Sequence, residues 1–427
     1  MDSFAQTAHL YRRLSFGGTL AELNAAATPQ NLIHDWLQRP PALVQLPAFE
    51  PIRRNRDASP EQRRQNRQKL RLQGRRLGGW LLEQMATAAN PLHEAIAGFW
   101  RDHFVVSLQK FNLPAFIGDY DLRLRAHAMG DFHDLLWSVT TSPAMLLYLD
   151  NQQNRVGNLN ENFSREVLEL FTIGPGQYSE RDIREGARAL TGRTIDVRAL
   201  RSGRVESSFR RFRHDGGTKT FLGHTGHLQT EDVVEILANH PSTARLLSEK
   251  LWSYFAYPNP DPELVQKLAD VFIQSDRNIA AWVEAAFSQP EFWSDRAYRS
   301  QIKSPLAFTL GAIRQLGIEA DYSRVLLSLR SMGQIPYMAP SVKGWPSSEG
   351  WLDTRGLLGR LDLARQMTRD RNDDTPYRFQ PGALTRTDLS ALLLDGSPLA
   401  GWHAAGSDLA LREVAALCLS SPLYQLA

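Results

Sequence analysis

Several features that assign a chain to a familiar class are scarce or missing in this sequence of 427 residues. Its single cysteine, Cys418, cannot form a disulfide within the chain, which favours a reducing compartment. No stretch reaches the roughly 20 apolar residues that a membrane-spanning helix needs. The N-terminal residues 1–18 lack the basic and then apolar pattern of a secretory signal. The sequence as given therefore predicts a cytoplasmic protein, or a periplasmic or exported one if a leader has been removed.

Short motifs that carry a known mechanism are also absent. The chain contains no HExxH zinc signature, Walker A loop, GxSxG elbow, dinucleotide-binding GxGxxG or EF-hand loop. No self-similar period of about 20–50 residues occurs, which argues against a solenoid. A function must therefore be sought in residue groups outside these motifs.

The hydrophobic pattern is helical over most of the chain. Apolar residues recur at spacings of three and four in segments such as 92–108 and 244–257. Strand-like composition is confined to residues 193–215, where Ser202-Gly203 supplies a turn. The pattern predicts a mainly α protein, with one large multi-helix single domain over residues 1–427 and a small β-hairpin insertion at 193–215.

Charge is distributed unevenly along the chain. Residues 53–76 carry ten Lys/Arg and two Asp/Glu, a net of +8, although the whole chain has a net charge of only +3. We expect this segment to be a basic helix or linker that docks on an acidic partner or anionic surface. Nucleic acid is the least expected partner, because no aromatic residues alternate with the cations to stack on bases.

The segment NENFSREVLEL, residues 160–170, suggests chemistry more strongly than any other. On a helix that advances about 100° per residue, Glu161, Arg165 and Glu169 share one side with Asn162 and Glu166. One interpretation is an exposed ladder of ion pairs. The other is a carboxylate cluster that faces a cavity and binds a metal or moves protons.

Candidate groups elsewhere are individually less specific. His103 lies in the apolar segment FWRDHF, where a lone histidine is more often a core residue than a ligand. His214 and Asp215 precede two glycines and Lys219, an arrangement that suits a ligand or acid–base loop and also an ordinary turn. Trp345 and Trp351 bracket a loop that either covers the core or stacks on a ligand.

The order of these segments resembles one bacterial family, which is catalogued as domain of unknown function 1800. The resemblance runs from about His9 to Met367, and NEN-x2-RE-x2-EL and HD-x3-K are its most specific elements. It implies that motif positions are occupied by Asn160, Glu161, Asn162, Arg165, Glu166, Glu169, His214, Asp215 and Lys219. The sequence departs from the family at Arg101 and Asp102, where a histidine-asparagine pair is usual. Members are often exported and encoded beside a sulfatase-like protein, which implies such a partner.

Together these observations give two hypotheses of different classes. The first is an uncharacterised metal-dependent enzyme, of hydrolase or oxygenase type, with a carboxylate and histidine pocket for Zn, Mn or Fe. Its predicted catalytic residues are Glu166, Glu169, Arg165 and Lys219. Its predicted metal ligands are His103, Glu161, Glu166, Glu169, His214 and Asp215. Its predicted substrate-binding residues, for an anionic substrate, are Asn162, Trp345 and Trp351.

The alternative is a non-catalytic protein-interaction or assembly module. In that case ion pairs fix the packing of helix 160–170, and segment 53–76 is the docking element. A hollow in which His214 and Glu166 converge would favour the enzyme.

Overall fold

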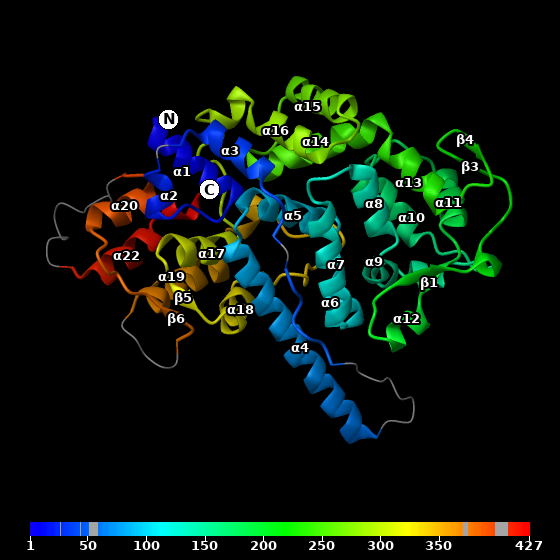
Figure 1. The fold of residues 1–427 in the computed structure, drawn as a ribbon, viewed down its shortest axis with the longest axis horizontal. Coiled ribbons are helices and arrows are strands. Elements are labelled where there is room, and N and C mark those ends of the chain that lie inside the picture. The colour runs from blue at the N-terminus through cyan, green and yellow to red at the C-terminus, as the bar shows by residue number, and fades with distance from the viewer. Residues whose placement is uncertain (26, 43, 51–58, 370–374, 398–408) are drawn as a thin grey trace.

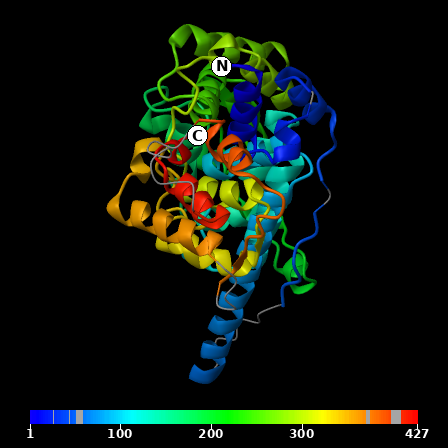
Figure 2. The same cartoon turned by 90° about the vertical axis from the view of Figure 1, so that its left-hand side faces the viewer.

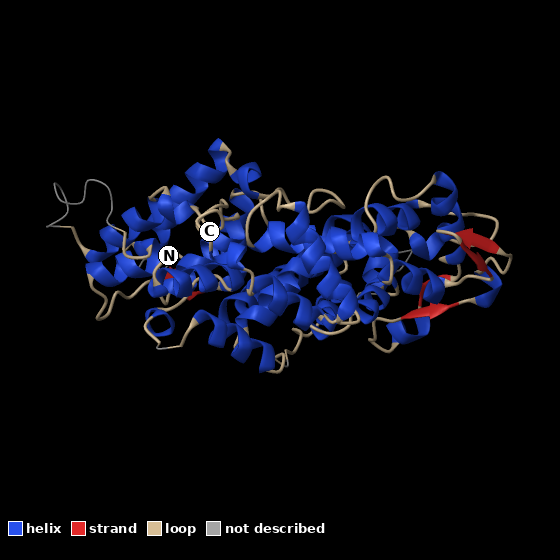
Figure 3. Cartoon of the chain, turned by 90° about the horizontal axis from the view of Figure 1, so that it is seen from above, coloured by secondary structure: helices blue, strands red, loops and turns tan. Residues whose placement is uncertain are grey.

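The structure is a computed structural model that describes residues 1–25, 27–42, 44–50, 59–369, 375–397 and 409–427. Helices dominate it, as Figures 1 and 3 show. The strands of the described residues form three two-stranded antiparallel sheets. The prediction of a mainly α protein with a small hairpin is confirmed.

The N-terminal part of the chain is built of helices. They are α1 (Ser3–Leu14), α2 (Leu20–Leu23), α3 (Pro29–Gln38), α4 (Pro60–Thr87), α5 (Pro91–His103), α6 (Leu108–Phe111), α7 (Pro114–His127), α8 (Phe132–Thr140) and α9 (Pro143–Tyr148). Several begin with proline directly after a polar cap, as α5 does after Asn90, whose side chain accepts from the backbone N–H of His93. Proline is suited to this position because its missing N–H would have no partner there.

The C-terminal part completes the helical body. Its helices are α13 (Thr230–Ala238), α14 (Pro241–Phe255), α15 (Pro262–Gln274), α16 (Ile279–Phe287), α17 (Pro305–Gln315), α18 (Tyr322–Ser331), α19 (Thr354–Thr368), α20 (Arg386–Leu394) and α22 (Leu411–Ser420). Stacked aromatic rings join the two parts, since Trp100 of α5 lies 6.4 Å from Trp282 of α16 between ring centroids.

Helix α4 is long, and its first half projects from the body in Figures 1 and 2. Its second half is buried, from Leu77 onward. Gly79 allows close contact with α18, because a Cβ there would lie 2.5 Å from the Ser323 hydroxyl. Residues 60–76 of the predicted basic segment are thus helical, whereas 53–58 lie outside the described residues.

The predicted hairpin at 193–215 has a different connection from the one expected. Strands β1 (Arg193–Ile195) and β2 (Ser207–Phe209) pair in antiparallel fashion, but α12 (Val197–Arg201) lies between them. The Asp196 carboxylate starts this helix by accepting from the backbone N–H groups of Arg198 and Ala199. Ser202 and Gly203 form a turn, as predicted, but this turn ends α12, and the helix is part of the connection between the two strands.

Two further sheets were not predicted from the sequence. Strand β3 (Lys219–Phe221) pairs with β4 (His224–Gly226), and β5 (Glu319–Ala320) pairs with β6 (Tyr377–Arg378). Each strand has only two or three residues, too few for an alternating pattern to stand out.

Candidate functional site around His103

Residues 160–170, the acidic segment, do not form one regular helix. A short α10 (Asn162–Glu166) continues as a π-helix, η2 (Val167–Phe171). A π-turn takes an extra residue, so side chains four apart no longer align, and such turns often occur at functional sites. Arg165 accordingly pairs with both carboxylate oxygens of Glu180 on α11 (Glu180–Ala189), at 3.0 Å each. The predicted ladder within one helix is thus replaced by ion pairs between two helices.

The end of the π-helix is held by two side chains from other helices. His103 Nε2 donates to the carbonyl of Phe171 at 2.9 Å, and Lys250 Nζ donates to the carbonyl of Leu170 at 2.7 Å. Because a carbonyl only accepts, His103 carries its proton on Nε2 and presents a lone pair on Nδ1. Lys250 Nζ lies 3.5 Å from that Nδ1. The acidic segment is therefore linked to the pair His103–Lys250.

This pair lines a cavity of about 420 Å³, large enough for a small organic molecule. Its walls come from α1, α5, α14 and α17 and from the loop before α19. Apolar side chains such as Phe99, Val105 and Val106 alternate with polar ones. The predicted substrate residues Trp345 and Trp351 also line it, with ring centroids 6.1 Å apart.

Gly344 brings the tryptophan loop close to α5. Its φ is +86°, and an added Cβ would meet the Asp102 carbonyl at 3.0 Å. Glycine therefore fits this position both by its φ and by the space available. The two indoles and His103 are thus predicted residues that the fold brings into one cavity.

Two ionisable groups in the cavity titrate close to neutral pH. Burial raises the pKa of Asp102 to about 6, against the lowering effects of a hydrogen bond from the Tyr254 hydroxyl and of Arg101. The Tyr254 oxygen lies 3.3 Å from Asp102 Oδ2. Burial likewise lowers the pKa of Lys250 to about 8. Burial and the neighbouring Lys250 hold the pKa of His103 well below its usual value, so the imidazole is neutral. A carboxyl and an amine with such pKa values can exchange protons at physiological pH.

The cavity has more basic than acidic side chains. Seven Lys and Arg side chains line it, against the carboxylates of Glu94 and Asp102. Several of the arginines are neutralised, as Arg101 is by Asp121 at 2.6 Å. Among the described residues, no carboxylate forms an ion pair with Lys250, Lys303 or Lys343. This surplus of positive charge favours an anionic ligand.

A buried ion network fixes α5 beneath the cavity. Asp121 of α7 accepts from both Arg101 and Arg125, at 2.6 Å each, and Arg125 also pairs with Glu94. Burial alone raises the pKa of Asp121, but the two guanidinium groups outweigh it and hold this pKa well below its usual value. Tyr337 donates a further hydrogen bond to Asp121 at 2.8 Å. Because each charge has a partner, the network is rigid.

The remaining predicted residues of the acidic segment lie outside the cavity lining. Glu166 is half-buried; burial and Glu169 raise its pKa, while Arg165 and Lys343 lower it. Glu169 accepts from the Tyr178 hydroxyl at 3.1 Å, and Asn162 donates to the carbonyl of Leu149 at 3.3 Å. Glu161 lies 3.5 Å from Arg184.

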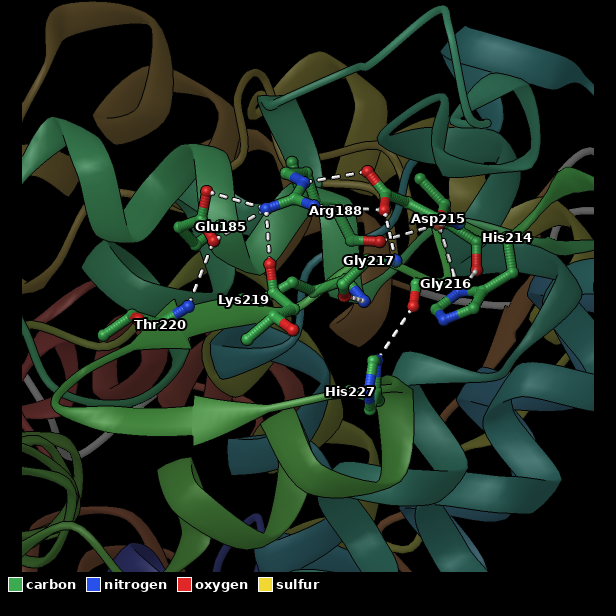
Figure 4. A network of polar contacts seen from close by, with 12 residues as sticks. Glu185, Arg188, His214, Asp215, Gly216, Gly217, Lys219, Thr220 and His227 are labelled. Carbon is green, nitrogen blue, oxygen red and sulfur yellow. Dashed lines mark hydrogen bonds and ion pairs between the residues drawn. The ribbon is translucent and has the colours of Figure 1, made fainter.

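The loop that contains His214 and Asp215, called the HD loop from here on, belongs to a separate polar network, shown in Figure 4. Arg188 of α11 bridges the carboxylates of Asp215, at 2.8 Å, and Glu185, at 2.9 Å. His214 Nδ1 lies 3.1 Å from both the hydroxyl and the carbonyl of Thr191. Lys219 is almost fully buried and donates to the carbonyl of Gly217 at 3.0 Å.

This network joins the loop and strand β3 to α11. The Glu185 carboxylate also accepts from the backbone N–H of Thr220 at 3.1 Å. No hydrogen bond or ion pair of the described residues joins His214 or Asp215 to Glu166. The structure therefore does not show the expected convergence of His214 and Glu166 in one hollow.

The six predicted metal ligands do not form one group. Over the described ranges, three His, Cys, Asp or Glu side chains have ligand atoms within 4.8 Å of one another only at Asp131, His133 and Asp134. This group lies at the start of α8, where Asp131 already caps the helix by accepting from the backbone N–H groups of His133 and Asp134. It includes none of the six predicted residues.

The sequence did not point to Asp102, Lys250 or Tyr254 as site residues. The available signal is Lys250 itself, which shares a helix side with the buried Leu247 and Leu251. A lysine in such a position is either paired or placed beside a cavity. Only the fold shows that it meets His103, which lies 147 positions earlier.

Fold and site together define a mostly helical protein with a cation-rich cavity. The family described as protein of unknown function (DUF1800) matches residues 9–426, so the chain belongs to this family. Comparison with curated proteins and with solved structures gives no match. Among the helices of the described residues, none combines the length and apolar character needed to span a membrane.

Proposed function

We propose that this protein is an enzyme that performs acid–base chemistry on a small organic anion in the cavity around His103. The single observation that carries the proposal is the grouping of His103, Lys250, Asp102 and Tyr254 in one cavity. Perturbed ionisable groups that meet in a cavity are typical of catalytic sites.

Each group has a role that follows from its environment. Asp102 exchanges a proton with the substrate, because its pKa of about 6 makes both of its forms accessible near neutral pH. The Lys250 ammonium binds the negative charge of the substrate or the charge that develops during reaction. His103 accepts from Lys250 through Nδ1 and so acts as a positioning residue. Trp345 and Trp351 contact the apolar part of the substrate.

A divalent ion, Zn, Mn or Fe, remains a prediction from the sequence. The fit is poor because the six predicted ligands are spread over the cavity wall, the α10–η2 segment and the HD loop. The hydrolase or oxygenase class rests on that ion, so the proposal includes no step that requires a metal. Glu166 and Glu169 have a supporting role here, through their position on the segment that His103 and Lys250 hold.

A binding screen with a turnover assay tests the proposal. Purified full chain is titrated with a panel of small carboxylate, phosphate and sulfate esters, and thermal unfolding is recorded. We expect a member of the panel to raise the melting temperature of the wild type, since an anion at about 100 times its Kd adds about 2.7 kcal/mol of stability. The Lys250→Met variant should lose this shift, and Asp102→Asn should retain binding but not turnover.

Lys267→Met provides the matched control, because Lys267 is an exposed lysine of α15 outside the cavity. It should respond to the anion as the wild type does. If no anion binds, or if both lysine variants respond equally, the enzyme proposal fails and the non-catalytic module becomes the better hypothesis.

A further inference from the structure

The projecting half of α4 has a composition that the cavity does not explain. Residues 60–76 carry seven Lys/Arg and one Asp/Glu, a net of +6, so the rest of the chain has a net charge of −3. Figures 1 and 2 show this half of the helix standing away from the body. A helix that is polar all round gains little from burial, so a separate reason for its charge is needed.

One side of this helix is covered by the chain itself. Lys69 pairs with Glu50 at 3.3 Å, Gln73 donates to the Glu50 carbonyl at 2.9 Å, and Arg76 donates to the Ala48 carbonyl at 3.4 Å. These three positions fall on one side of a helix at about 100° per residue. Residues 48–50 therefore occupy that side.

The opposite side presents a stripe of arginines. On the same wheel, Arg64, Arg67 and Arg71 fall within an arc of about 60° and extend over about 10 Å of the helix. All three are exposed, and among the described residues none of them forms an ion pair or a side-chain hydrogen bond. Like charges at three- and four-residue spacing destabilise a helix, so the stripe is unfavourable until an anion neutralises it.

We propose that this arginine stripe docks an acidic segment of a partner protein. Guanidinium groups bind carboxylates in a bidentate manner, and carboxylates spaced by one helical turn match the spacing of Arg67 and Arg71. The surface offers no apolar face for insertion into a membrane: within 60–76 the aliphatic residues are Leu70 and the exposed Leu72, which lie about 160° apart around the helix.

A protein partner fits better than nucleic acid. The phosphate backbone of a duplex continues beyond a short contact, and beyond the helix it would meet a chain of net charge −3. Residues 60–76 also contain no aromatic side chain that could stack on bases. A compact acidic segment needs only the stripe itself.

The test uses the full chain and two fluorescent probes, a polyglutamate peptide and a short DNA duplex, in anisotropy titrations at low and at physiological salt. We expect the peptide to bind wild type, and to bind the triple variant Arg64→Gln, Arg67→Gln, Arg71→Gln at least about tenfold more weakly, as three ion pairs of modest strength would require. Glutamine keeps the helix propensity close to that of arginine, which circular dichroism can verify.

The control removes three other exposed arginines, with the changes Arg181→Gln, Arg211→Gln and Arg245→Gln, so the net charge is equal in both variants. It should bind the peptide as wild type does. Tighter binding of the duplex than of the peptide would overturn the proposal in favour of nucleic acid. Absence of peptide binding, or an equal loss in the control, would also overturn it. None of these outcomes bears on the cavity.

Discussion

Lys250 of α14 donates to the carbonyl of Leu170 at 2.7 Å, near the end of the π-helix that includes the last four residues of the family motif at 160–170. The same ammonium lies 3.5 Å from His103 Nδ1. One lysine therefore connects the acidic segment, the imidazole and the cavity. The Glu-rich motif is linked to the proposed site through its backbone, while its carboxylates form other contacts.

Replacing Lys250 should weaken the fold as well as ligand binding. In Lys250→Met the Leu170 carbonyl loses its partner, so we expect the free energy of unfolding to fall by about 1–3 kcal/mol. Urea denaturation with a fluorescence readout measures this. Lys267→Met, on the exposed side of α15, also removes a hydrogen bond, from Lys267 Nζ to Gln289 Oε1 at 2.7 Å, but the exposed ammonium has water nearby and its loss should cost less. Equal costs in the two variants would show that the Leu170 contact contributes no more than this surface hydrogen bond.

Asp102→Asn should stabilise the protein while removing its activity. Because burial raises the pKa of Asp102 to about 6, the folded state binds its proton more tightly than the unfolded state. Ionisation above pH 6 is therefore unfavourable to folding, and the asparagine avoids that cost. We expect a gain of about 1–2 kcal/mol at pH 8 that vanishes at about pH 3 and below, where the Asp102 carboxyl is largely protonated in both the native and the unfolded state. Thermal melts at the two pH values test this, and a variant less stable than wild type at pH 8 would contradict it.

His103 should make stability fall on acidification. Its folded pKa is well below that of the unfolded chain, so the unfolded state takes up the proton first. The stabilising contribution is present above about pH 6.5 and is lost as pH falls below it, at about 1.4 kcal/mol per pH unit. The His103→Gln variant should show a flatter curve of unfolding free energy between pH 6.5 and 5. His9, whose pKa is also depressed by burial, provides a reference, because a His9→Gln variant should keep the His103 contribution. If His103→Gln retains the wild-type slope, the neutral buried imidazole is excluded.

Replacing Asp215, the partner of Arg188, tests whether the HD loop has a structural or a functional role. Asp215→Asn removes a charge partner from Arg188, and we expect a loss of about 1–3 kcal/mol in unfolding free energy with no change in anion binding at the cavity. Calorimetric titration of the variant with the anion found in the screen measures the second point. Loss of anion binding in a folded variant would return His214 and Asp215 to the site.

Elemental analysis tests the predicted divalent ion. Since the six predicted ligands share no site of metal-ligand dimensions, we expect protein purified without a metal-chelating tag to contain Zn, Mn and Fe only in substoichiometric amounts. Chelator treatment should leave anion binding unchanged. One tightly held equivalent of metal that is lost in a Glu166→Gln variant would contradict this expectation.

Local sequence signals predicted those features that depend on local interactions. The helical periodicity follows from residues close together in the chain. Residues 53–76 were predicted as a basic helix or linker, and Trp345 and Trp351 as a cover of the core or a surface for a ligand; the sequence left both choices open. The π-turn at Val167–Phe171 could not be predicted this way, because its last carbonyls are satisfied by His103 and Lys250 from distant helices. For the same reason Asp102 was seen only as a departure from the family pattern, although its pKa depends on the cavity wall.

Competitive labelling of lysines tests the central claim most directly. The protein is treated with a limiting amount of an amine-reactive anhydride near pH 8, with and without the anion found in the screen, and the modified lysines are quantified by mass spectrometry. With its pKa of about 8, Lys250 should be modified faster than exposed lysines such as Lys267, and the anion should protect it selectively. Labelling of Lys250 at the same rate as Lys267, with no protection by any anion of the panel, would contradict the account.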